Sequence, residues 1–317
     1  GFDPLGGIET VPSSDAYSRF LKKLIREQAA LDEMFDSLMV ELKRQLPDLG
    51  QHLAVDSKAI PTHARGRMDP SQSGDPDADW GKKVKRGQRA DGTLWEKVTK
   101  WFGYKLHLLV DSHYELPLSW KLTRASRSDS RELIPRVKDL KKHHPDRIEV
   151  AKDLSADKGY DSEKNNAWLW DECSIKPLID IRSMWKDGEK TRLLDEEKTD
   201  NVVYDEKGQV YCHCPRTGER REMAYQGFEK DRQSLKYRCP ASAYGFECRG
   251  RSQCGSCSES EYGRIVRIPL EKDRRIFTPI ARSSAAWSRG YKRRTSVERV
   301  NSRLDTSFQF ERHYIRG

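Results

Sequence analysis

Residues Val150 to Tyr160 have the sequence Val-Ala-Lys-Asp-Leu-Ser-Ala-Asp-Lys-Gly-Tyr, which predicts a short strand that ends at an acidic turn. Asp157 stands at the end of this strand, and a helical pattern begins after Asp161. An acid in such a place is often the N-cap of the following helix. Asp161 is the better candidate for that cap, which leaves Asp157 available for another role.

A second acid, Asp56, follows another strand-like run. The segment from His52 to Ile60 is His-Leu-Ala-Val-Asp-Ser-Lys-Ala-Ile, in which three apolar residues precede a turn-prone Asp-Ser pair. A short apolar run that ends in this way is typical of a buried strand. The sequence therefore places Asp56 and Asp157 at the ends of two strands.

The remaining segments of this region predict alternating strands and helices. We expect strands over residues 105–110, 116–123 and 175–181, and helices over residues 131–143 and 162–171. The order β-β-β-α-β-α-β favours an α/β fold, a ribonuclease-H-like catalytic core with a mixed sheet flanked by helices. In such folds the first and fourth strands are neighbours, so Asp56 and Asp157 would meet.

A third group of candidate residues lies near the end of the chain. Tyr291, Arg294 and Glu298 share one face of a helix that turns about 100° per residue, and Asp305 continues that stripe. An adjacent apolar stripe would dock the helix on a core, and consists of Val297, Val300, Leu304 and Phe308. Either the helix holds a carboxylate beside a phosphate, or it is a surface helix with an ordinary Arg–Glu pair.

Four segments, taken in order, resemble an insertion-sequence transposase of the DDE class, the bacterial kind with a Tyr-Arg-Glu-Lys signature, in a subtype with a Cys-rich insert. They are Ala54–Lys58, Phe102–His107, Ser155–Asp161 and Tyr291–Arg299. The resemblance implies a DNA transposase that hydrolyses phosphodiester bonds and transfers strands at transposon ends. It also implies an Asp-Asp-Glu catalytic triad, made of Asp56, Asp157 and Glu298.

The resemblance implies two Mg²⁺ or Mn²⁺ ions, which activate water and stabilise the leaving 3′ oxygen when they lie about 4 Å apart. Carboxylate oxygens are the ligands that Mg²⁺ prefers. Asp56 would bridge both ions, Asp157 would hold one and Glu298 the other. Arg294 would bind a phosphate near the scissile bond through its planar guanidinium, and Tyr291 would stack or hydrogen-bond at the transposon end.

One position departs from the family pattern, because Asp305 stands where the family has a Lys that helps to hold transposon-end DNA. An Asp cannot donate a hydrogen bond to a phosphate and would repel it. A catalytically degenerate nucleic-acid-binding domain of transposon origin is therefore the alternative function. A ribonuclease-H-like nuclease unconnected with transposition is a third. Asp153 competes with Asp157, but the Gly-Tyr pair after Asp157 and the family pattern favour Asp157.

The chain of 317 residues is strongly charged and basic, with 34% charged residues and a formal net charge of +9. This balance favours a polyanionic partner, of which nucleic acid is the usual one, over a merely soluble basic surface. The positive charge is concentrated in residues 82–105 and 264–294, on either side of the candidate carboxylates in the sequence. Such blocks are typical of a groove that follows phosphates.

Six of the seven cysteines fall in one segment between the strand over residues 175–181 and the candidate Glu298 helix. They are Cys212, Cys214, Cys239, Cys248, Cys254 and Cys257. Two close pairs with single cysteines between them suit a tetrahedral structural zinc. Free thiols left from a family ancestor, or disulfides, are the alternatives. The seventh, Cys173, is expected to be a small buried apolar residue.

These patterns divide the chain into four parts: a helical N-terminal region over residues 1–48, the first part of the core over 49–181, a Cys-rich insertion over 182–285, and the Glu helix that completes the core over 286–317. The N-terminal region should hold two helices, capped first by Ser14 or Asp15. Residues 62–101, polar and then basic, predict a mobile loop.

No apolar run approaches the 18 residues of a membrane span, and no signal peptide is recognisable. We therefore expect a cytoplasmic, nucleoid-associated prokaryotic protein. The resemblance implies double-stranded DNA, both transposon ends and target, as the partner, and a homodimer in the active complex. It also implies that the chain is cut at both ends from a longer protein.

Overall fold

The computed structural model describes residues 12–67, 73–195, 201–214, 216–251 and 262–308, and the chain divides into two compact units, Gly1–Leu49 and Gly50–Gly317. The first unit holds α1 (Ser14–Arg26) and α2 (Gln28–Gln45). Both helices were predicted, but the cap of α1 is Ser13, whose hydroxyl accepts a hydrogen bond from the amide of Ala16 at 3.3 Å.

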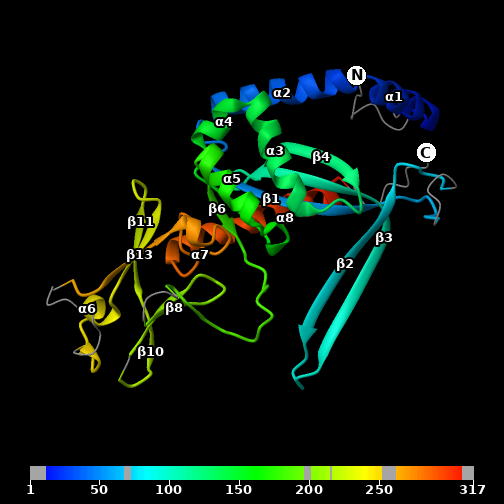
Figure 1. Cartoon of the computed structure of the whole chain (residues 1–317). Helices are drawn as coiled ribbons and strands as arrows, with labels where there is room; N and C mark the ends of the chain where they lie inside the picture. Colours follow the sequence, from blue (N-terminus) through cyan, green and yellow to red (C-terminus); the bar gives the residue numbers. More distant parts are fainter. Residues whose placement is uncertain (1–11, 68–72, 196–200, 215, 252–261, 309–317) are drawn as a thin grey trace. The chain divides into compact units, whose positions relative to one another are not determined.

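The second unit is built on a mixed sheet in the order β2-β3-β1-β5-β6, with β4 also paired to β3 (Figure 1). β1 runs antiparallel to β3 and parallel to β5, and β5 runs parallel to β6. The strands are β1 (His52–Pro61), β2 (Asp79–Gln88), β3 (Leu94–Asp111), β4 (Leu116–Arg124), β5 (Asp153–Ala156) and β6 (Lys176–Ile179). The predicted mixed α/β fold and the predicted pairing of the first and fourth core strands are therefore confirmed.

Helices cover both faces of this sheet because its side chains alternate between the two faces. Leu106 and Leu108 of β3 pack with Val297 and Val300 of α8 (Thr295–Thr306) on one face. Lys105, which directly precedes Leu106 and so points to the other face, binds Asp129 at 3.0 Å, at the start of α3 (Asp129–His143). α4 (Pro145–Val150) and α5 (Glu163–Cys173) complete the layer of helices.

The prediction of a mobile loop over residues 62–101 is wrong for its second half. β2 and the first part of β3 form a long hairpin that extends beyond the other strands (Figure 1). Its register pairs Trp80 with Phe102 and Val84 with Val98. Aromatic and β-branched cross-strand pairs of this kind stabilise an antiparallel ribbon. The sequence did not predict this ribbon because charged residues dominate the segment.

Between β6 and the C-terminal helices the chain forms two small antiparallel sheets. The first sheet consists of β7 (Arg192–Leu193), β8 (Val202–Tyr204), β9 (Val210–His213) and β10 (Arg220–Glu222). The second consists of β11 (Ala224–Glu229), β12 (Ser234–Arg238) and β13 (Ile265–Pro269), and α6 (Pro240–Tyr244) lies between β12 and β13 in the sequence. A common hydrophobic core joins these sheets to α5 through Trp170, which packs edge-on against Phe228 at 5.4 Å between ring centroids. This region is thus packed onto the main sheet.

The hairpin leaves the sheet at Gly103, where the backbone has a φ of 149° and passes close to β1. A Cβ atom at this position would overlap the carbonyl oxygen of Ile60 and lie 2.8 Å from the amide nitrogen of Thr62. Both are backbone atoms that form strand contacts, so they cannot move away without breaking the pairing.

We expect Gly103→Ala to lower the free energy of unfolding by about 3 kcal/mol, from backbone strain and overpacking together. Gly188→Ala is the matched control, because Gly188 has a φ of 84° but nothing within 4 Å of its missing Cβ. It should cost about 1 kcal/mol. Urea denaturation of both variants checks this, and equal losses would show that the close approach at Gly103 is not tight.

Candidate active site

Asp56 and Asp157 lie side by side because the strands that carry them are paired. Val55 of β1 stands opposite Ala156 of β5 in the parallel register, and each acid is the next residue along its strand direction. Asp56 accepts a hydrogen bond from the amide of Ser57 at 2.8 Å, and Asp157 accepts one from the amide of Gly159 at 2.7 Å. The two carboxylates thus meet where β5 ends. The expectation that Asp56 also ends its strand is wrong, because β1 continues to Pro61 through its pairing with β3.

The expectation that Asp161 caps the next helix, and that Asp157 has no capping duty, is wrong. Asp157 is the N-cap of a short 3₁₀ turn over Lys158–Tyr160, and Ser162 caps α5 by accepting a hydrogen bond from the amide of Asn165 at 3.1 Å. This extra turn lies between the strand and α5 and needs an N-cap of its own. Asp157 occupies that position, which would not exist if the strand passed directly into the helix.

Burial, with a smaller contribution from the neighbouring charge of Asp157, raises the pKa of Asp56 to about 6, against the opposing effects of the Ser57 amide and of Lys83 and Arg294. Tyr160 is fully buried nearby. Its burial raises the pKa of its hydroxyl well above the ordinary range, with added contributions from the charges of Asp56 and Asp157. Two like charges are therefore held together in a partly dehydrated site.

Arg294 and Tyr291 lie next to this pair of acids. The ring of Tyr291 stacks on Trp287, with 4.6 Å between centroids and 10° between planes, and the Arg294 guanidinium lies 5.8 Å from the centre of the Tyr291 ring. Burial raises the pKa of Tyr291, and Asp180 and Asp157 contribute to the shift. Trp287 and Asp180 were not singled out from the sequence; the i,i+4 spacing of Trp287 and Tyr291 is the signal that could have found the stack.

Glu298 is half-exposed and binds Arg294 at 2.7 Å. The continuous helix predicted for this segment is broken: α7 (Ala285–Tyr291) is followed by a 3₁₀ turn over Lys292–Arg294 and then by α8. Glu298 therefore connects to the two aspartates through Arg294, whose charge acts on Asp56.

The apolar stripe that docks the helix was predicted correctly at three of its four positions. Val297, Val300 and Leu304 pack on the sheet, whereas Phe308 is 67% exposed beyond the end of α8. The helix ends at Thr306, so the periodic pattern does not extend to Phe308.

Asp305, where the family pattern has Lys, forms an ion pair with Lys58 at 2.7 Å. Lys58 follows Asp56 by two residues on the same face of β1 and is nearly buried, with 11% of its side chain exposed. The positive charge of Lys58 thus balances the negative charge of Asp305. Asp305 should therefore repel a DNA phosphate less than the sequence alone suggested.

The competing acids have other partners. Asp153, at the opposite end of β5 from Asp157, binds His52 at 2.8 Å and lies 3.6 Å from Arg293. Asp111 accepts hydrogen bonds from the amides of Gly50, His113 and Tyr114 in the β3–β4 turn. Both are therefore structural in this arrangement, which favours Asp157 as the site residue on β5.

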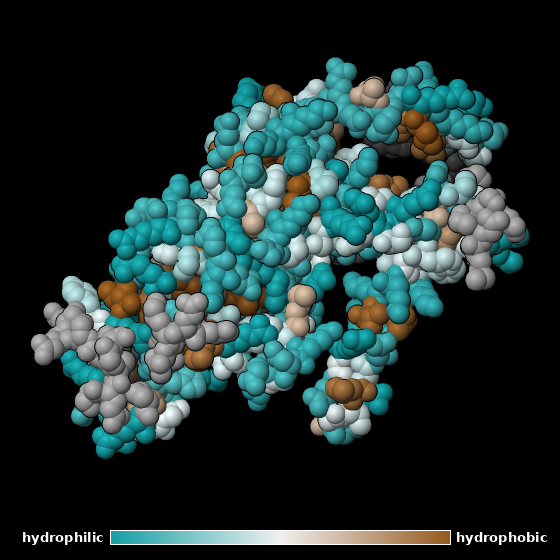
Figure 2. Space-filling view, in the orientation of Figure 1, coloured by the Kyte–Doolittle hydropathy of each residue, from teal (hydrophilic) through white to brown (hydrophobic). Residues whose placement is uncertain are grey.

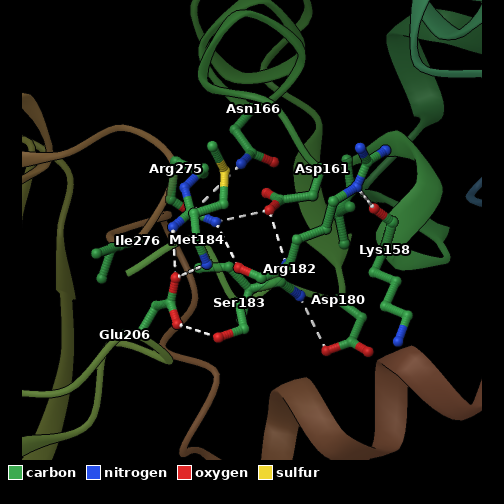
Figure 3. Close-up of polar contacts among 12 residues, drawn as sticks. Lys158, Asp161, Asn166, Asp180, Arg182, Ser183, Met184, Glu206, Arg275 and Ile276 are labelled. Carbon is green, nitrogen blue, oxygen red and sulfur yellow. Dashed lines mark hydrogen bonds and ion pairs between the residues drawn. The ribbon is translucent and has the colours of Figure 1, made fainter. Parts of the chain in front are cut away.

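A network of arginines fixes the turn that follows Asp157 (Figure 3). The guanidinium of Arg182 donates hydrogen bonds to the carbonyls of Lys158 and Gly159, and its amide donates to Asp161 at 2.9 Å. Arg275 binds Asp161 at 2.8 Å and Glu206 at 3.4 Å. Arg182, before the two small sheets in the sequence, and Arg275, after them, thus hold the turn that follows Asp157. No sequence motif predicts this role.

The four described cysteines of the predicted zinc set, Cys212, Cys214, Cys239 and Cys248, line one pocket of about 460 Å³. Cys254 and Cys257 lie outside the described residues. Hydrogen bonds from Thr217 lower the pKa of the partly buried Cys214 thiol. Among the described residues no three His, Cys, Asp or Glu side chains form a metal-binding group. The zinc site therefore stays a prediction.

Comparison with known proteins identifies the family. The chain matches the family described as Transposase DDE domain over residues 47–317. The chain belongs to this family. Its mixed sheet is consistent with the ribonuclease-H-like core expected of such a transposase. No helix among the described residues is long and apolar enough to cross a membrane.

Among solved structures, the chain is similar to a piggyBac transposase synaptic complex with hairpin DNA, at 12% sequence identity and a TM-score of 0.36. The match covers 81% of this chain and 41% of that chain, so the chain spans less than half the length of that transposase. No curated protein matches the chain.

The raised pKa of Asp56 predicts a pH-dependent effect of Asp56→Asn on the metal-free protein. Above pH 6 the folded state carries the cost of an ionised Asp56, so the variant should be more stable, by about 2 kcal/mol. The gain should disappear below pH 4, where the carboxyl group is protonated in both states. Thermal and urea unfolding in EDTA at pH 4 and pH 8 test this, and a destabilised variant at pH 8 would contradict it.

Removing Arg275 should destabilise the whole second unit, because Asp161 has a fully buried side chain. We expect Arg275→Ala to cost about 3 to 5 kcal/mol of unfolding free energy, since it leaves a buried charge short of its partner. Arg232→Ala is the control, because Arg232 is paired only with the exposed Asp231 at 3.8 Å; it should cost less than about 1 kcal/mol. Equal effects in urea denaturation would contradict the role of the network.

Proposed function

We propose that this chain is the catalytic domain of a DNA transposase, which hydrolyses phosphodiester bonds at transposon ends and transfers the freed strands to target DNA. The proposal assigns an Asp-Asp-Glu triad to Asp56, Asp157 and Glu298. The observation that carries it is the juxtaposition of Asp56, within β1, and Asp157, directly after the end of the parallel strand β5, in a chain of the transposase DDE family.

The donor set fits Mg²⁺ or Mn²⁺ at the two aspartates. Asp56 and Asp157 supply carboxylate oxygens. Burial and, to a smaller extent, the charge of Asp157 raise the pKa of Asp56, and a bound cation would offset both effects. Glu298 would have to release Arg294 to join them. Divalent ions bound here would activate the attacking water or 3′ hydroxyl and stabilise the leaving oxygen.

The side chains around the triad would hold the DNA. Arg294 is placed to exchange Glu298 for a phosphate, because its fork-shaped guanidinium binds carboxylate and phosphate equally well. Phosphate binding by Arg294 would free the Glu298 carboxylate at the moment when substrate arrives. Tyr291, fixed by its stack on Trp287, would contact the DNA at the transposon end.

The finer identity is also part of the proposal. The Tyr-Arg-Glu spacing in α7 and α8 supports a bacterial insertion-sequence transposase, acting as a homodimer on double-stranded DNA in the cytoplasm. The four-part division, with a Cys-rich insertion over residues 182–285, belongs to the same proposal. The Lys58–Asp305 pair favours an active domain over a catalytically degenerate one, because it neutralises the departure from the family pattern.

Cleavage and strand transfer test the triad directly. Full-length protein with Mn²⁺ should cut duplex DNA that carries the inverted-repeat ends of its own element. Asp56→Asn, Asp157→Asn and Glu298→Gln should each reduce the product about a thousandfold, because each removes several kcal/mol of stabilisation from the transition state.

Glu163→Gln, at the first turn of α5, is the matched control, since Glu163 is an exposed acid near Asp157 in the sequence. It should leave cleavage unchanged. DNA binding without any metal-dependent cleavage by the wild-type protein would instead support the degenerate domain. Unchanged activity in the three triad variants would refute the assigned residues.

A further inference from the structure

The two faces of the β2–β3 hairpin differ in character. Because residues paired in an antiparallel register point to the same side, four consecutive odd-numbered pairs share one face. They are Gly81 with Trp101, Lys83 with Thr99, Lys85 with Lys97, and Gly87 with Trp95. We call this the Trp–Lys face: two tryptophans with three lysines between them and no acid.

The two tryptophans are fixed against the ribbon by the glycines opposite them. A Cβ atom at Gly87 would lie 2.6 Å from the indole of Trp95, and one at Gly81 would overlap the indole of Trp101. Each indole therefore lies flat across its glycine, with its other ring face turned away from the strand. Trp95 remains 37% exposed, although a large aromatic residue of this kind is usually buried.

The lysines of the Trp–Lys face are exposed and have no ion-pair partner among the residues that the structure describes. Lys85 and Lys97 stand directly opposite each other, an arrangement of like charges that costs stability in a sheet. On the other face Arg86 is balanced by Glu96 at 2.6 Å. The opposite face also carries two facing lysines, Lys82 and Lys100, so what distinguishes the Trp–Lys face is three lysines with no acid between two tryptophans. This combination suits an anionic ligand that spans several residues.

The hairpin continues into the sheet that carries the candidate active site. β3 runs from Trp101 through Gly103 and then pairs with β1, where Leu108 stands opposite Asp56. Figure 2 shows the hairpin as a limb that is mostly hydrophilic with two small hydrophobic patches. A polymer bound along the hairpin would therefore contact the same strand that pairs with β1.

We propose that the Trp–Lys face of the β2–β3 hairpin binds the backbone of duplex DNA. The proposal rests on the proposed function, because the substrate of the Asp56 site is then DNA. Lys83, Lys85 and Lys97 contact phosphates, and Trp95 and Trp101 pack against sugars at the two ends of the row. A two-stranded ribbon is narrow enough to enter the major groove. The lysines would contact phosphates, which are the same in every DNA sequence, so binding should not depend on the base sequence.

The test compares two cross-strand lysine pairs that occupy opposite faces of the hairpin, three residues apart along β2. Lys85→Gln with Lys97→Gln removes two charges from the Trp–Lys face, and Lys82→Gln with Lys100→Gln removes two from the opposite face. Affinity for a labelled duplex of mixed sequence is measured with the full chain in EDTA over a range of salt concentrations. No cleavage occurs under these conditions, so the result does not depend on the triad.

We expect the first double variant to bind the duplex at least about tenfold more weakly at low salt, with a slope of log affinity against log salt that is smaller by about 1.8. The second should bind within about twofold of wild type with an unchanged slope. Melting temperatures should not fall in either variant, because each change relieves like-charge repulsion.

Equal losses in the two double variants would overturn the proposal, since they would show a general effect of net charge. Unchanged duplex binding by the first variant would overturn it as well. A loss confined to a single-stranded oligonucleotide of the same length would mean that the face binds unpaired DNA by stacking on the tryptophans, and would reject the duplex.

Discussion

The parallel pairing of β1 with β5 is the contact on which the candidate site depends. It sets Val55 opposite Ala156, and so brings together two acids that are far apart in the sequence. On one face of the sheet, Val297 and Val300 of α8 pack against Ala54 of β1 and against β3. The same helix carries Glu298, and Arg294 lies in the turn just before it. The core that stabilises the sheet therefore also fixes where the third acid and the arginine lie.

The two small sheets contribute to this site from a distance. Arg182 precedes them in the chain, Arg275 follows them, and both bind the turn after Asp157. Glu206, which lies between β8 and β9, completes the network. The segments on either side of these sheets thus hold the turn after Asp157 in place, and this structural role does not require a metal in the cysteine-lined pocket.

Much of the fold follows from local sequence patterns. The strands before Asp56 and Asp157, the helix after Asp129 and the docking stripe of α8 have the expected periodicity, and their order predicts the mixed sheet. The hairpin was missed because its charged residues mask the cross-strand pairs Trp80–Phe102 and Val84–Val98. The 3₁₀ turns after Asp157 and Tyr291 depend on tertiary contacts, so they leave no periodic signal. The partners of Asp305 and Asp161 are likewise distant in the sequence and could be found only in the folded chain.

Divalent-metal binding tests the central claim, that paired carboxylates on β1 and β5 form the catalytic centre. Titration of the full chain with Mn²⁺ at neutral pH, followed by calorimetry or by the electron paramagnetic resonance of the free ion, should detect binding. Asp56→Asn and Asp157→Asn should each abolish it, and Asp153→Asn, at the opposite end of β5, should leave it intact. Binding of equal strength in all four proteins would contradict the account.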